Sequence, residues 1–452
     1  MAKKNRKTNS IALRPPRRGR DAVTRITVSG YKSIAAEQAV HIGPITVLAG
    51  ANSSGKSSIF QPLLLLKQTL EATYDPGPLL INGPNVKFTS TDQLFSQCGS
   101  DATTEHLNIG IEIQGSASVH TEFIRENRKL SIGEMRVVSE GREQRFRLGM
   151  SAEDLNGVLP KADAKAFRDA FGLTSERLHW RVTRNRCFLE VSLMSGEQEF
   201  MFVRTTPAEI VIPHIRGLIH LPGLRGNPER AYPVSAVGDT FPGTFDKYAA
   251  SVIAKWETEH QLDNLRKAGE YLEALGLTWK VATEPLDETQ VQVKVGRLPH
   301  AGADGEGDLV NIADVGVGMS QALPIVVALV VARAGQLVYI EQPEIHLHPA
   351  AQTKLADVFA DAARRGVRVI VETHSSLLLL AIQTVVASGR LAPSDVKLHW
   401  FTRDSAGRTQ VAFGELDETG AFGEWPEDFG RVVLGAESEY IEAASERLQD
   451  VS

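Results

Sequence analysis

The chain has 452 residues, of which 42% are hydrophobic and 23% are charged, and its formal net charge is −6. This composition excludes a collagen-like repeat, a disulfide-stapled miniprotein and a chain disordered throughout, and the negative charge excludes a basic nucleic-acid coat protein. The two cysteines, Cys98 and Cys187, form no CxxC metal or redox pair. The longest apolar run, residues 322–332, is shorter than the roughly 20 residues that cross a bilayer. We therefore expect a protein of the reducing cytoplasm without a membrane partner.

The first 20 residues differ in charge from the rest of the chain. They contain eight Lys and Arg residues, no Asp or Glu, and the pair Pro15 and Pro16. This pattern predicts a disordered basic tail over residues 1–20. Two roles stay open for it: a solvated tail that keeps the protein in solution, or an arm that binds the phosphates of DNA or RNA.

A glycine-rich loop follows the apolar segment Ile45–Leu48. Its sequence, GANSSGKS, fits the phosphate-loop pattern GxxxxGK[ST], with a predicted strand before it and a predicted helix after it. Gly50 and Gly55 let the backbone approach an anion closely. The N–H groups of the loop, including those of Ser53 and Ser54, and the helix N-terminus then hold phosphate. Lys56 is expected to reach the β- and γ-phosphates of ATP, and the Ser57 hydroxyl to be a ligand of Mg²⁺.

A carboxylate follows a second apolar strand, Leu337–Ile340. Ligands of open α/β sheets bind at the carboxyl ends of parallel strands, so Glu341 is expected to hold Mg²⁺, directly or through water. Most related nucleotide hydrolases have a glutamate at the next position. Here it is Gln342, and an amide orients a water molecule without accepting its proton. Glu344 is the nearest carboxylate that substitutes as the base; its other interpretation is an N-cap or surface acid before a helix starting near Ala350.

Two further segments complete the candidate site. The strand Val367–Val371 leads into the sequence ETHS, where His374 is placed as a sensor of the γ-phosphate. Upstream, residues 311–321 place glycines and a serine before an apolar helix, which predicts a second anion-binding helix N-terminus. One nucleotide needs only one phosphate loop. The second site is therefore expected to serve the nucleotide of another subunit across a dimer.

Together these motifs resemble the heads of ABC-type ATPases. The segments ITVSGYKSI, IGPITVLAGANSSGKSS, IEQPEIHLHP and ETHS are similar to those of the prokaryotic AAA-type relatives of the OLD proteins and of the SMC and recombination ATPases. The resemblance implies an α/β fold, a P-loop NTPase of ABC-ATPase type with a mixed sheet and an inserted β-rich and helical lobe. It also implies ATP and Mg²⁺ as cofactors.

The resemblance implies roles for individual residues. Those implied to bind phosphate and Mg²⁺ are Asn52, Gly55, Lys56, Ser57 and Ser58, and those implied to contact the partner subunit's γ-phosphate are Gly318, Ser320 and Gln321. Lys32 is implied to lie near the nucleotide, Glu341 to hold the metal-bound water, and His374 to act as a switch. Gln93 or Gln97 is expected to link Mg²⁺ to the middle lobe. Glu341 in place of the usual aspartate, together with Gln342, implies slow hydrolysis or a dependence on Glu344.

Changes of pattern along the chain predict five parts. They are a basic tail (1–20), the N-terminal half of the ATPase domain (21–100), an inserted β-rich and helical lobe (101–304), the C-terminal half of the ATPase domain (305–410) and a small C-terminal domain (411–452). Period-two alternation predicts an antiparallel meander in the lobe, and residues 244–275 are expected to be helical. In and before the loop 221–232, Arg216, Arg225 and Arg230 mark either a solvated turn or a cluster for DNA phosphate or an acidic partner.

We expect an ATPase that binds and slowly hydrolyses ATP, forms a homodimer or higher homo-oligomer around ATP, and switches a partner effector. No nuclease-type pattern of acids or histidines follows His374, so the effector is expected to be a separate polypeptide, a nuclease or a toxin. The resemblance implies anti-phage defence as the setting. Two alternatives stay open: an ATPase of the DNA-repair type that acts directly on DNA, and an ATP-binding scaffold with little hydrolysis.

Overall fold

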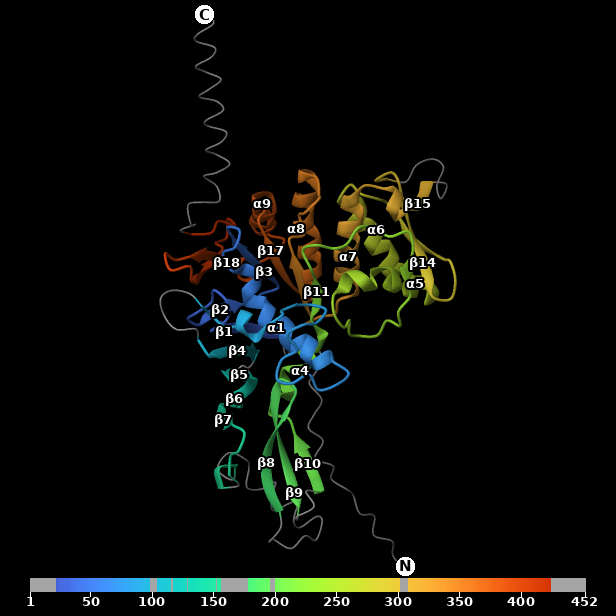
Figure 1. The fold of residues 1–452 in the computed structure, drawn as a ribbon. Coiled ribbons are helices and arrows are strands. Elements are labelled where there is room, and N and C mark those ends of the chain that lie inside the picture. Colours follow the sequence, from blue (N-terminus) through green and yellow to red (C-terminus); the bar gives the residue numbers. More distant parts are fainter. Residues whose placement is uncertain are drawn as a thin grey trace, which may run out of the picture.

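The computed structural model describes residues 22–97, 104–114, 117–127, 129–151, 153–155, 178–195, 200–300 and 308–423. The basic tail of residues 1–20, Cys98 and residues 424–452 lie outside these ranges. The described part contains a mostly parallel sheet, a six-stranded antiparallel sheet and two smaller sheets (Figure 1). Within these ranges, every helix is too short or too polar to span a membrane.

The mostly parallel sheet, here called the central sheet, contains the strand that leads into the phosphate loop. Its strands lie in the order β11-β16-β17-β3-β18-β19, and all pairs are parallel except β18 with β19. Their bounds are β3 Ile45–Gly50, β11 Ile219–Leu221, β16 Leu337–Glu341, β17 Arg368–Thr373, β18 Val396–Arg403 and β19 Thr409–Glu415. All residues of β3 are buried, as expected for a strand covered on both faces.

The two faces of the central sheet pack against different elements. Val47 and Val338 belong to a core formed with helices, whereas their neighbours Leu48 and Tyr339 belong to a second core formed with α1 and the antiparallel sheet. The helices of the first core include α7 Val317–Val331, α8 Pro349–Arg364 and α9 Ser376–Ala387, and α1 spans Lys56–Glu71. Successive residues of a strand point to opposite faces, which explains this division. Helix α1 is thus enclosed between two sheets, and this packing holds the phosphate loop at its N-terminus.

The antiparallel sheet has the strand order β2-β1-β4-β5-β6-β7. Its strands are β1 Val23–Ser29, β2 Gln38–His41, β4 His106–Ile113, β5 Ala117–Glu126, β6 Lys129–Ser139 and β7 Arg142–Phe146. Consecutive strands from β4 to β7 pair with each other, which confirms the predicted antiparallel meander. In Figure 1 this sheet lies below the central sheet, on the side of α1.

The remaining elements form two smaller sheets and a helical group. The first sheet is β10-β9-β8, with β8 Leu178–Asn185, β9 Phe188–Ser195 and β10 Phe200–Thr205, followed by α4 Ile212–Gly217. The second contains β12 Tyr232–Pro233, β13 Val281–Pro285, β14 Gln290–Gly296 and β15 Leu309–Asn311. The helix predicted over residues 244–275 is interrupted, because α5 (Ala249–Thr258) and α6 (Leu262–Ala274) are separated by a turn in which His260 has a φ of 55°. The predicted α/β fold of the P-loop ABC-ATPase type is confirmed; the boundaries of the five parts stay predictions.

Candidate active site

The phosphate loop requires its two glycines. Gly50 has a φ of 146° and Gly55 a φ of 105°, a region that other residues rarely adopt. A Cβ on Gly50 would lie 2.3 Å from the carbonyl oxygen of Phe401, and a Cβ on Gly55 would lie 2.2 Å from Thr409 Oγ1. The loop is therefore shaped by close contact with β18 and β19 of the central sheet.

Lys56 is the first residue of α1 and its ammonium group turns back to the loop. Its Nζ donates to the carbonyl oxygens of Gly50, at 3.0 Å, and Ala51, at 2.8 Å. Burial lowers the pKa of Lys56, while the negative charges of Glu372 and Glu344 oppose this shift. Among the described residues, the ammonium group bonds only these two uncharged carbonyl groups. It is able to exchange them for phosphate oxygens, because hydrogen bonds between charged partners are stronger.

The other predicted loop residues differ in exposure. Asn52 and Ser53 are exposed, and Ser57 and Ser58 are half-buried. Ser54 is buried, and its hydroxyl group has no hydrogen-bond partner among the described residues. A buried hydroxyl without a partner is unusual in proteins, and beside a row of loop N–H groups it fits an anionic ligand. The predicted loop residues thus lie together at the N-terminus of one helix.

The Ser57 hydroxyl contacts an acid that the sequence interpretation overlooked. It donates to Oε1 of Glu372 at 2.8 Å, and Tyr339 donates to Oε2 of the same carboxylate, also at 2.8 Å. Glu372 is in β17, the strand next to β3. Burial raises the pKa of Glu372, and the charge of Glu341 raises it further, against the effect of the two hydroxyl groups. The direct partner of the Ser57 hydroxyl is thus Glu372; the roles of Ser57 and Glu341 in binding Mg²⁺ stay predictions.

Glu341 ends β16 and is held by groups from β11 and the loop after it. Its Oε1 accepts from His220 Nε2 at 3.1 Å, and its Oε2 accepts from the N–H of Gly223 at 3.2 Å. Asn85 Nδ2 lies 3.0 Å from His220 Nδ1 and 3.0 Å from the carbonyl oxygen of Gly243. Because a carbonyl oxygen only accepts, this amide nitrogen donates, and the imidazole proton is therefore on Nε2. Burial alone would raise the pKa of Glu341, but the His220 contact and the Gly223 N–H outweigh it and lower the pKa.

Glu344 is neither an N-cap nor a surface acid. The cap of α8 is His348, whose side chain accepts from the N–H of Ala350. Glu344 Oε1 accepts from the N–H of His374 at 2.8 Å, and Oε2 is buried without a hydrogen-bond partner among the described residues. Burial raises the pKa of Glu344 despite the His374 contact. The neighbouring Thr373 side chain also lowers this pKa, but burial outweighs these contacts, so the carboxylate has the increased basicity that a general base needs.

His374 also lies beside the phosphate loop. Burial and the positive charge of Lys56 lower the pKa of His374, and a contact with the backbone of Gly50 opposes the shift. The imidazole is therefore neutral at pH 7. The structure thus brings together His374, Glu344 and the loop, as the sequence interpretation expected.

Gln342 has a left-handed backbone, with a φ of 44°, and this backbone is held by Arg225. Arg225 is only 3% exposed, and its guanidinium donates to the carbonyl oxygens of Glu341 and Gln342, each at 3.2 Å. Burial lowers the pKa of Arg225 to about 10, so it remains a cation at pH 7.

The three arginines named from the sequence, Arg216, Arg225 and Arg230, form no shared surface. Arg216 donates to the carbonyl oxygen of Leu70, and Arg230 pairs with Asp314. The interpretation of Arg225 as part of a solvated turn or phosphate cluster is wrong.

The signature segment lies at the start of α7. Gly316 is its N-cap and is exposed, as is Val317, whereas Gly318 is half-buried. The Ser320 hydroxyl donates to the carbonyl oxygen of Val317 at 2.8 Å. Gln321 is buried, and its Nε2 donates to the carbonyl oxygens of Arg225 and Gly226. The Gln321 amide nitrogen is thus used within the chain, and its contact with a partner's phosphate stays a prediction.

Three predicted residues contact other parts of the chain. Lys32 Nζ donates to Gln61 Oε1 of α1 at 2.6 Å, and burial lowers the pKa of Lys32. Gln93 Oε1 accepts from the N–H of Thr89 at 3.0 Å, and Gln97 Nε2 donates to the carbonyl oxygen of Asp92. Neither glutamine contacts Ser57 or Glu341 in the described part, so the metal role of Gln93 is without structural support.

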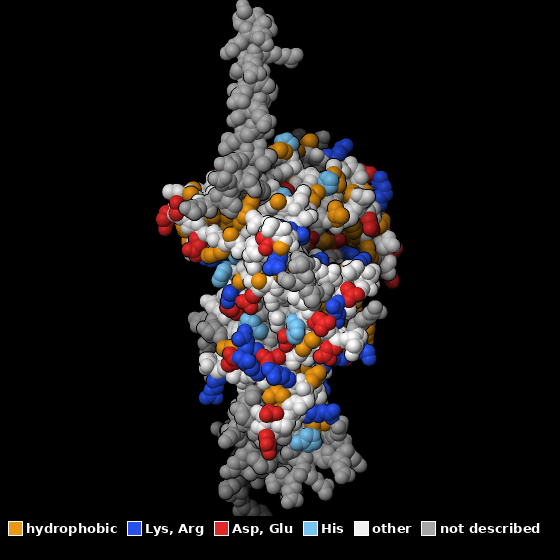
Figure 2. Space-filling model, turned by 60° about the vertical axis from the view of Figure 1, so that its left-hand side comes forward, with side chains coloured by type: hydrophobic (Ala, Val, Ile, Leu, Met, Phe, Trp, Pro, Cys, Tyr) orange, Lys and Arg blue, Asp and Glu red, His pale blue; other side chains and the backbone are white. Residues whose placement is uncertain are grey.

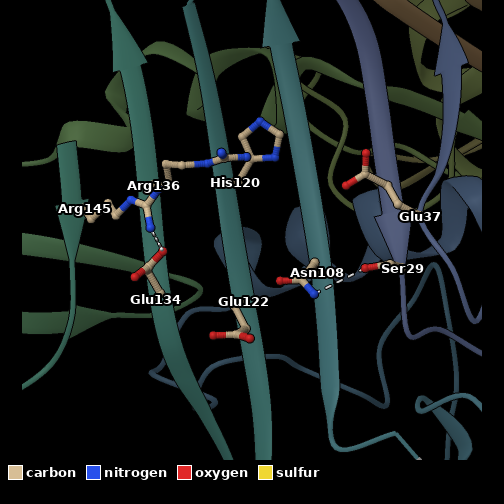
Figure 3. A pocket seen from close by; sticks show the side chains of 8 residues that line it. All are labelled: Ser29, Glu37, Asn108, His120, Glu122, Glu134, Arg136 and Arg145. Carbon is tan, nitrogen blue, oxygen red and sulfur yellow. Dashed lines mark hydrogen bonds and ion pairs between the residues drawn. The ribbon is translucent and has the colours of Figure 1, made fainter. Parts of the chain in front are cut away.

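A hollow of about 230 Å³ lies apart from this site, on the outer face of the antiparallel sheet (Figure 3). The residues that line it are Ser29, Glu37, Asn108, His120, Glu122, Glu134, Arg136 and Arg145. Acidic and basic side chains alternate there, and Figure 2 shows them mixed over the visible face. A surface of mixed sign does not suit a nucleic-acid backbone, which favours a field of one sign.

One family model matches the chain, and its description is "AAA domain, putative AbiEii toxin, Type IV TA system". It matches residues 45–148 and 256–381, more than half of the chain, and includes the phosphate loop, the signature segment and the ends of β16 and β17. The chain belongs to this AAA domain family. It is accordingly a P-loop ATPase by family and fold. We find no match among curated proteins.

Solved structures similar to this AAA-family chain include heads of SMC proteins. An Smc head bound to the C-winged helix domain of ScpA has 13% identity and a TM-score of 0.46, over 88% of this chain and 98% of that chain. The SMC head domain from Thermotoga maritima has 10% identity and a TM-score of 0.41, over 86% and 98%. An Smc head domain with an extended coiled coil, bound to the C-terminal domain of ScpA derived from Pyrococcus furiosus, has 10% identity and a TM-score of 0.45, over 87% and 96%.

Sequence reasoning gave no role to three residues of this AAA-family site, His220, Tyr339 and Glu372, and it misinterpreted a fourth, Arg225. A signal existed for Glu372, which directly follows a run of apolar residues in its strand, as Glu341 does. His220 gave little signal, because β11 has only 3 residues. Among the described residues, no group of three or more His, Cys, Asp or Glu side chains forms a metal site. Two carboxylates and a hydroxyl suit Mg²⁺, which usually completes its shell with phosphate oxygens and water.

Proposed function

We propose that this chain binds Mg²⁺–ATP at the phosphate loop and hydrolyses it slowly, with Glu344 as the base. The observation that carries this proposal is the position of Glu344. Its Oε2 is buried and has no hydrogen-bond partner among the described residues, and the charge of Glu344 acts on Lys56. Gln342 orients the attacking water and Glu344 accepts its proton, so the missing glutamate at position 342 is replaced two residues later. The backbone N–H of His374 donates to Glu344, and the neutral imidazole of His374 contacts the γ-phosphate.

The loop residues supply the nucleotide contacts in this proposal. The backbone from Gly50 to Ser58, with the side chains of Asn52, Ser53 and Ser54, surrounds the phosphates, and Lys56 binds their β and γ oxygens. Mg²⁺, when bound, neutralises phosphate charge. The side chains that would surround it are Ser57 and the two acids Glu341 of β16 and Glu372 of β17. Lys32 lies beside α1, on the nucleotide side.

Equilibrium binding of a fluorescent ATP analogue to the full-length chain tests this step. Lys56→Ala is expected to weaken binding by at least about tenfold, because a charge-assisted contact to phosphate is lost. Lys354→Ala is the matched control, since this lysine of α8 is 56% exposed and pairs only weakly, at 3.7 Å, with Asp357. Equal affinities of the two variants would contradict the proposed site.

We further propose that two copies close around ATP, as a homodimer or a higher homo-oligomer. In such a sandwich the start of α7, with Gly318 and Ser320, faces the γ-phosphate bound by the partner subunit. Support comes from the exposed helix start at Gly316 and Val317, where backbone N–H groups favour an anion. Gln321 is left out of this contact, because its amide holds the loop around Arg225.

The proposed biological role is an ATP-controlled switch for a separate effector, a nuclease or toxin, in anti-phage defence within the cytoplasm. The description of the matched family, with its toxin and toxin–antitoxin terms, supports this direction, as does the OLD-like sequence resemblance. Expression with the product of a neighbouring gene, followed by phage challenge, tests it. Protection that is lost in Lys56→Ala supports the switch, and protection that persists contradicts it.

The alternative is a DNA-repair type of ATPase that acts directly on DNA, for which the basic tail is the motivation. Deletion of residues 1–20 is then expected to weaken DNA binding and reduce its dependence on salt concentration, because phosphate contacts are lost. Unchanged DNA affinity and salt dependence would rule out the tail as a DNA-binding arm. ATP binding is expected to be unaffected by the deletion. Absence of hydrolysis in the intact chain would instead favour the ATP-binding scaffold.

A further inference from the structure

We infer that Glu372, rather than Glu341, is the carboxylate that shares a divalent cation with Ser57. The inference rests on the proposed binding of Mg²⁺–ATP. It departs from the expectation that the acid ending β16 takes this role, and it is drawn from the contacts of the two carboxylates and from the order of the strands.

Strand order places Glu372 nearest to the phosphate loop. β17 lies between β16 and β3, and Glu372 is opposite Leu48 of β3 and opposite Glu341 of β16. The 2.8 Å hydrogen bond from Ser57 to Glu372 spans from the first turn of α1 to the end of this neighbouring strand. For a cation bound by the Ser57 oxygen, Glu372 is therefore the nearer of the two carboxylates.

The contacts of Glu341 direct it away from Ser57. Its two oxygens accept from His220, in β11, and from the N–H of Gly223, just after β11. β11 lies on the side of β16 opposite to β17. Both carboxylate oxygens of Glu341 are thus bound on the side of β11, whereas those of Glu372 are bound by Tyr339 and by Ser57 of the phosphate loop.

The surroundings of Glu372 favour a cation. The carboxylate belongs to a residue that is 5% exposed, and in the described part no lysine or arginine forms an ion pair with it or with Glu341. The charge of Glu341 raises the pKa of Glu372, and the charge of Lys56 opposes this shift. A divalent ion between neighbouring carboxylates relieves their repulsion. Carboxylate and hydroxyl oxygens are also the ligands that Mg²⁺ accepts.

Tyr339 acts as a positioning residue for this carboxylate. Its ring is stacked between Phe60, at a centroid distance of 4.6 Å, and His220, at 5.5 Å. Its hydroxyl is thereby directed at Glu372 Oε2, which leaves Oε1 toward Ser57. Hydrogen bonds of this kind orient metal-binding carboxylates and are themselves important for metal affinity.

The test is Mn²⁺ affinity, measured by electron paramagnetic resonance on the full-length chain with a non-hydrolysable ATP analogue. Glu372→Gln and Glu341→Gln form a matched pair, because each removes one charge from the end of neighbouring strands. Glu372→Gln is expected to weaken Mn²⁺ binding by about 10- to 100-fold, and Glu341→Gln by less than about threefold. A larger loss in Glu341→Gln, or an equal loss in both, would overturn the inference.

Binding of the analogue in EDTA separates this inference from the proposed function. Both variants are expected to bind it as the wild type does, which also shows that they are folded. If the wild type binds no nucleotide with or without metal, the proposed function itself fails. If Glu372→Gln does not fold, Glu372→Asp replaces it: its shorter side chain withdraws the carboxylate from Ser57, so reduced Mn²⁺ affinity supports the inference and wild-type affinity overturns it.

Discussion

Arg225 donates a hydrogen bond of 3.2 Å from Nη2 to the carbonyl oxygen of Gln342, and its own carbonyl oxygen accepts from the side chain of Gln321. One loop thus connects the start of α7 with the backbone beside the proposed base. Because the guanidinium is buried and binds two carbonyl groups, this loop couples the start of α7 to the segment that carries Glu341 and Gln342.

Arg225→Lys tests this connection. A lysine keeps the charge but lacks the planar fork that reaches two carbonyl oxygens, so one buried acceptor loses its partner at a cost of about 1–3 kcal/mol. We expect kcat for ATP hydrolysis to fall by about tenfold or more, with nucleotide affinity nearly unchanged. Arg230→Lys is the control, because this arginine of the same loop is 72% exposed and pairs with Asp314. A fall in affinity without a fall in kcat would contradict the assignment.

The pH dependence of hydrolysis reports on Glu344. Burial raises the pKa of this carboxyl group above its ordinary value of 4.5, and only the deprotonated form acts as a base. The rate is therefore expected to be highest above the raised pKa and to decrease as the pH falls through it, at a pH above that of an ordinary glutamate. Steady-state rates of ATP hydrolysis across the acidic pH range measure this decrease.

Glu418→Gln is the control for the pH profile, because Glu418 is exposed and far along the chain from the site. This variant is expected to show the same decrease of the hydrolysis rate at acidic pH as the wild type. A rate that is flat down to pH 4.5 in the wild type would show that no carboxylate with a raised pKa limits the reaction.

Gly55→Ala is expected to disrupt the phosphate loop. The backbone φ of 105° strains any residue with a Cβ by about 1–3 kcal/mol, and the new methyl group would lie 2.2 Å from Thr409 Oγ1. We predict a loss of ATP binding and a lower free energy of unfolding, measured by urea titration. Gly217→Ala, at the end of α4, has no atom within 4 Å of the added Cβ and should leave both unchanged.

Val317→Glu tests the proposed dimer. Val317 is 41% exposed at the start of α7, so a charge there is tolerated by the single chain but repels the γ-phosphate held by a partner subunit. We expect the ATP-dependent increase in mass, measured by light scattering, to disappear while ATP affinity is retained. The control is Leu286→Glu, at a residue that is 48% exposed after β13. Dimerisation that persists in Val317→Glu would exclude this face.

The phosphate loop and its roles were predictable because the motif is local. Gly50, Gly55 and Lys56 lie between one strand and one helix that are adjacent in sequence, so their spacing alone defines the geometry. The pairing of Ser57 with Glu372 was not predictable in this way. β16 ends in Glu341 and β17 has Glu372 as its last residue but one, and only the order of strands in the folded sheet decides which acid lies beside β3.

His220 and Arg225 were beyond sequence reasoning for a different reason. His220 belongs to a strand of 3 residues, too short to show periodicity, and its partner Glu341 is 121 positions away. Arg225 stands in a Gly- and Pro-rich loop, a composition typical of exposed turns. It is buried because the carbonyl groups of Glu341 and Gln342 supply acceptors that only the tertiary fold brings near.

The central claim is that Glu344 acts as the base of an ATPase in which Gln342 occupies the usual position of the glutamate. Multi-turnover ATP hydrolysis by the full-length chain, compared with Glu344→Gln at equal nucleotide saturation, tests it most directly. We predict measurable turnover by the wild type and a rate lower by about 10²- to 10⁴-fold in Glu344→Gln, with ATP affinity preserved. Hydrolysis by Glu344→Gln at the wild-type rate would contradict the account.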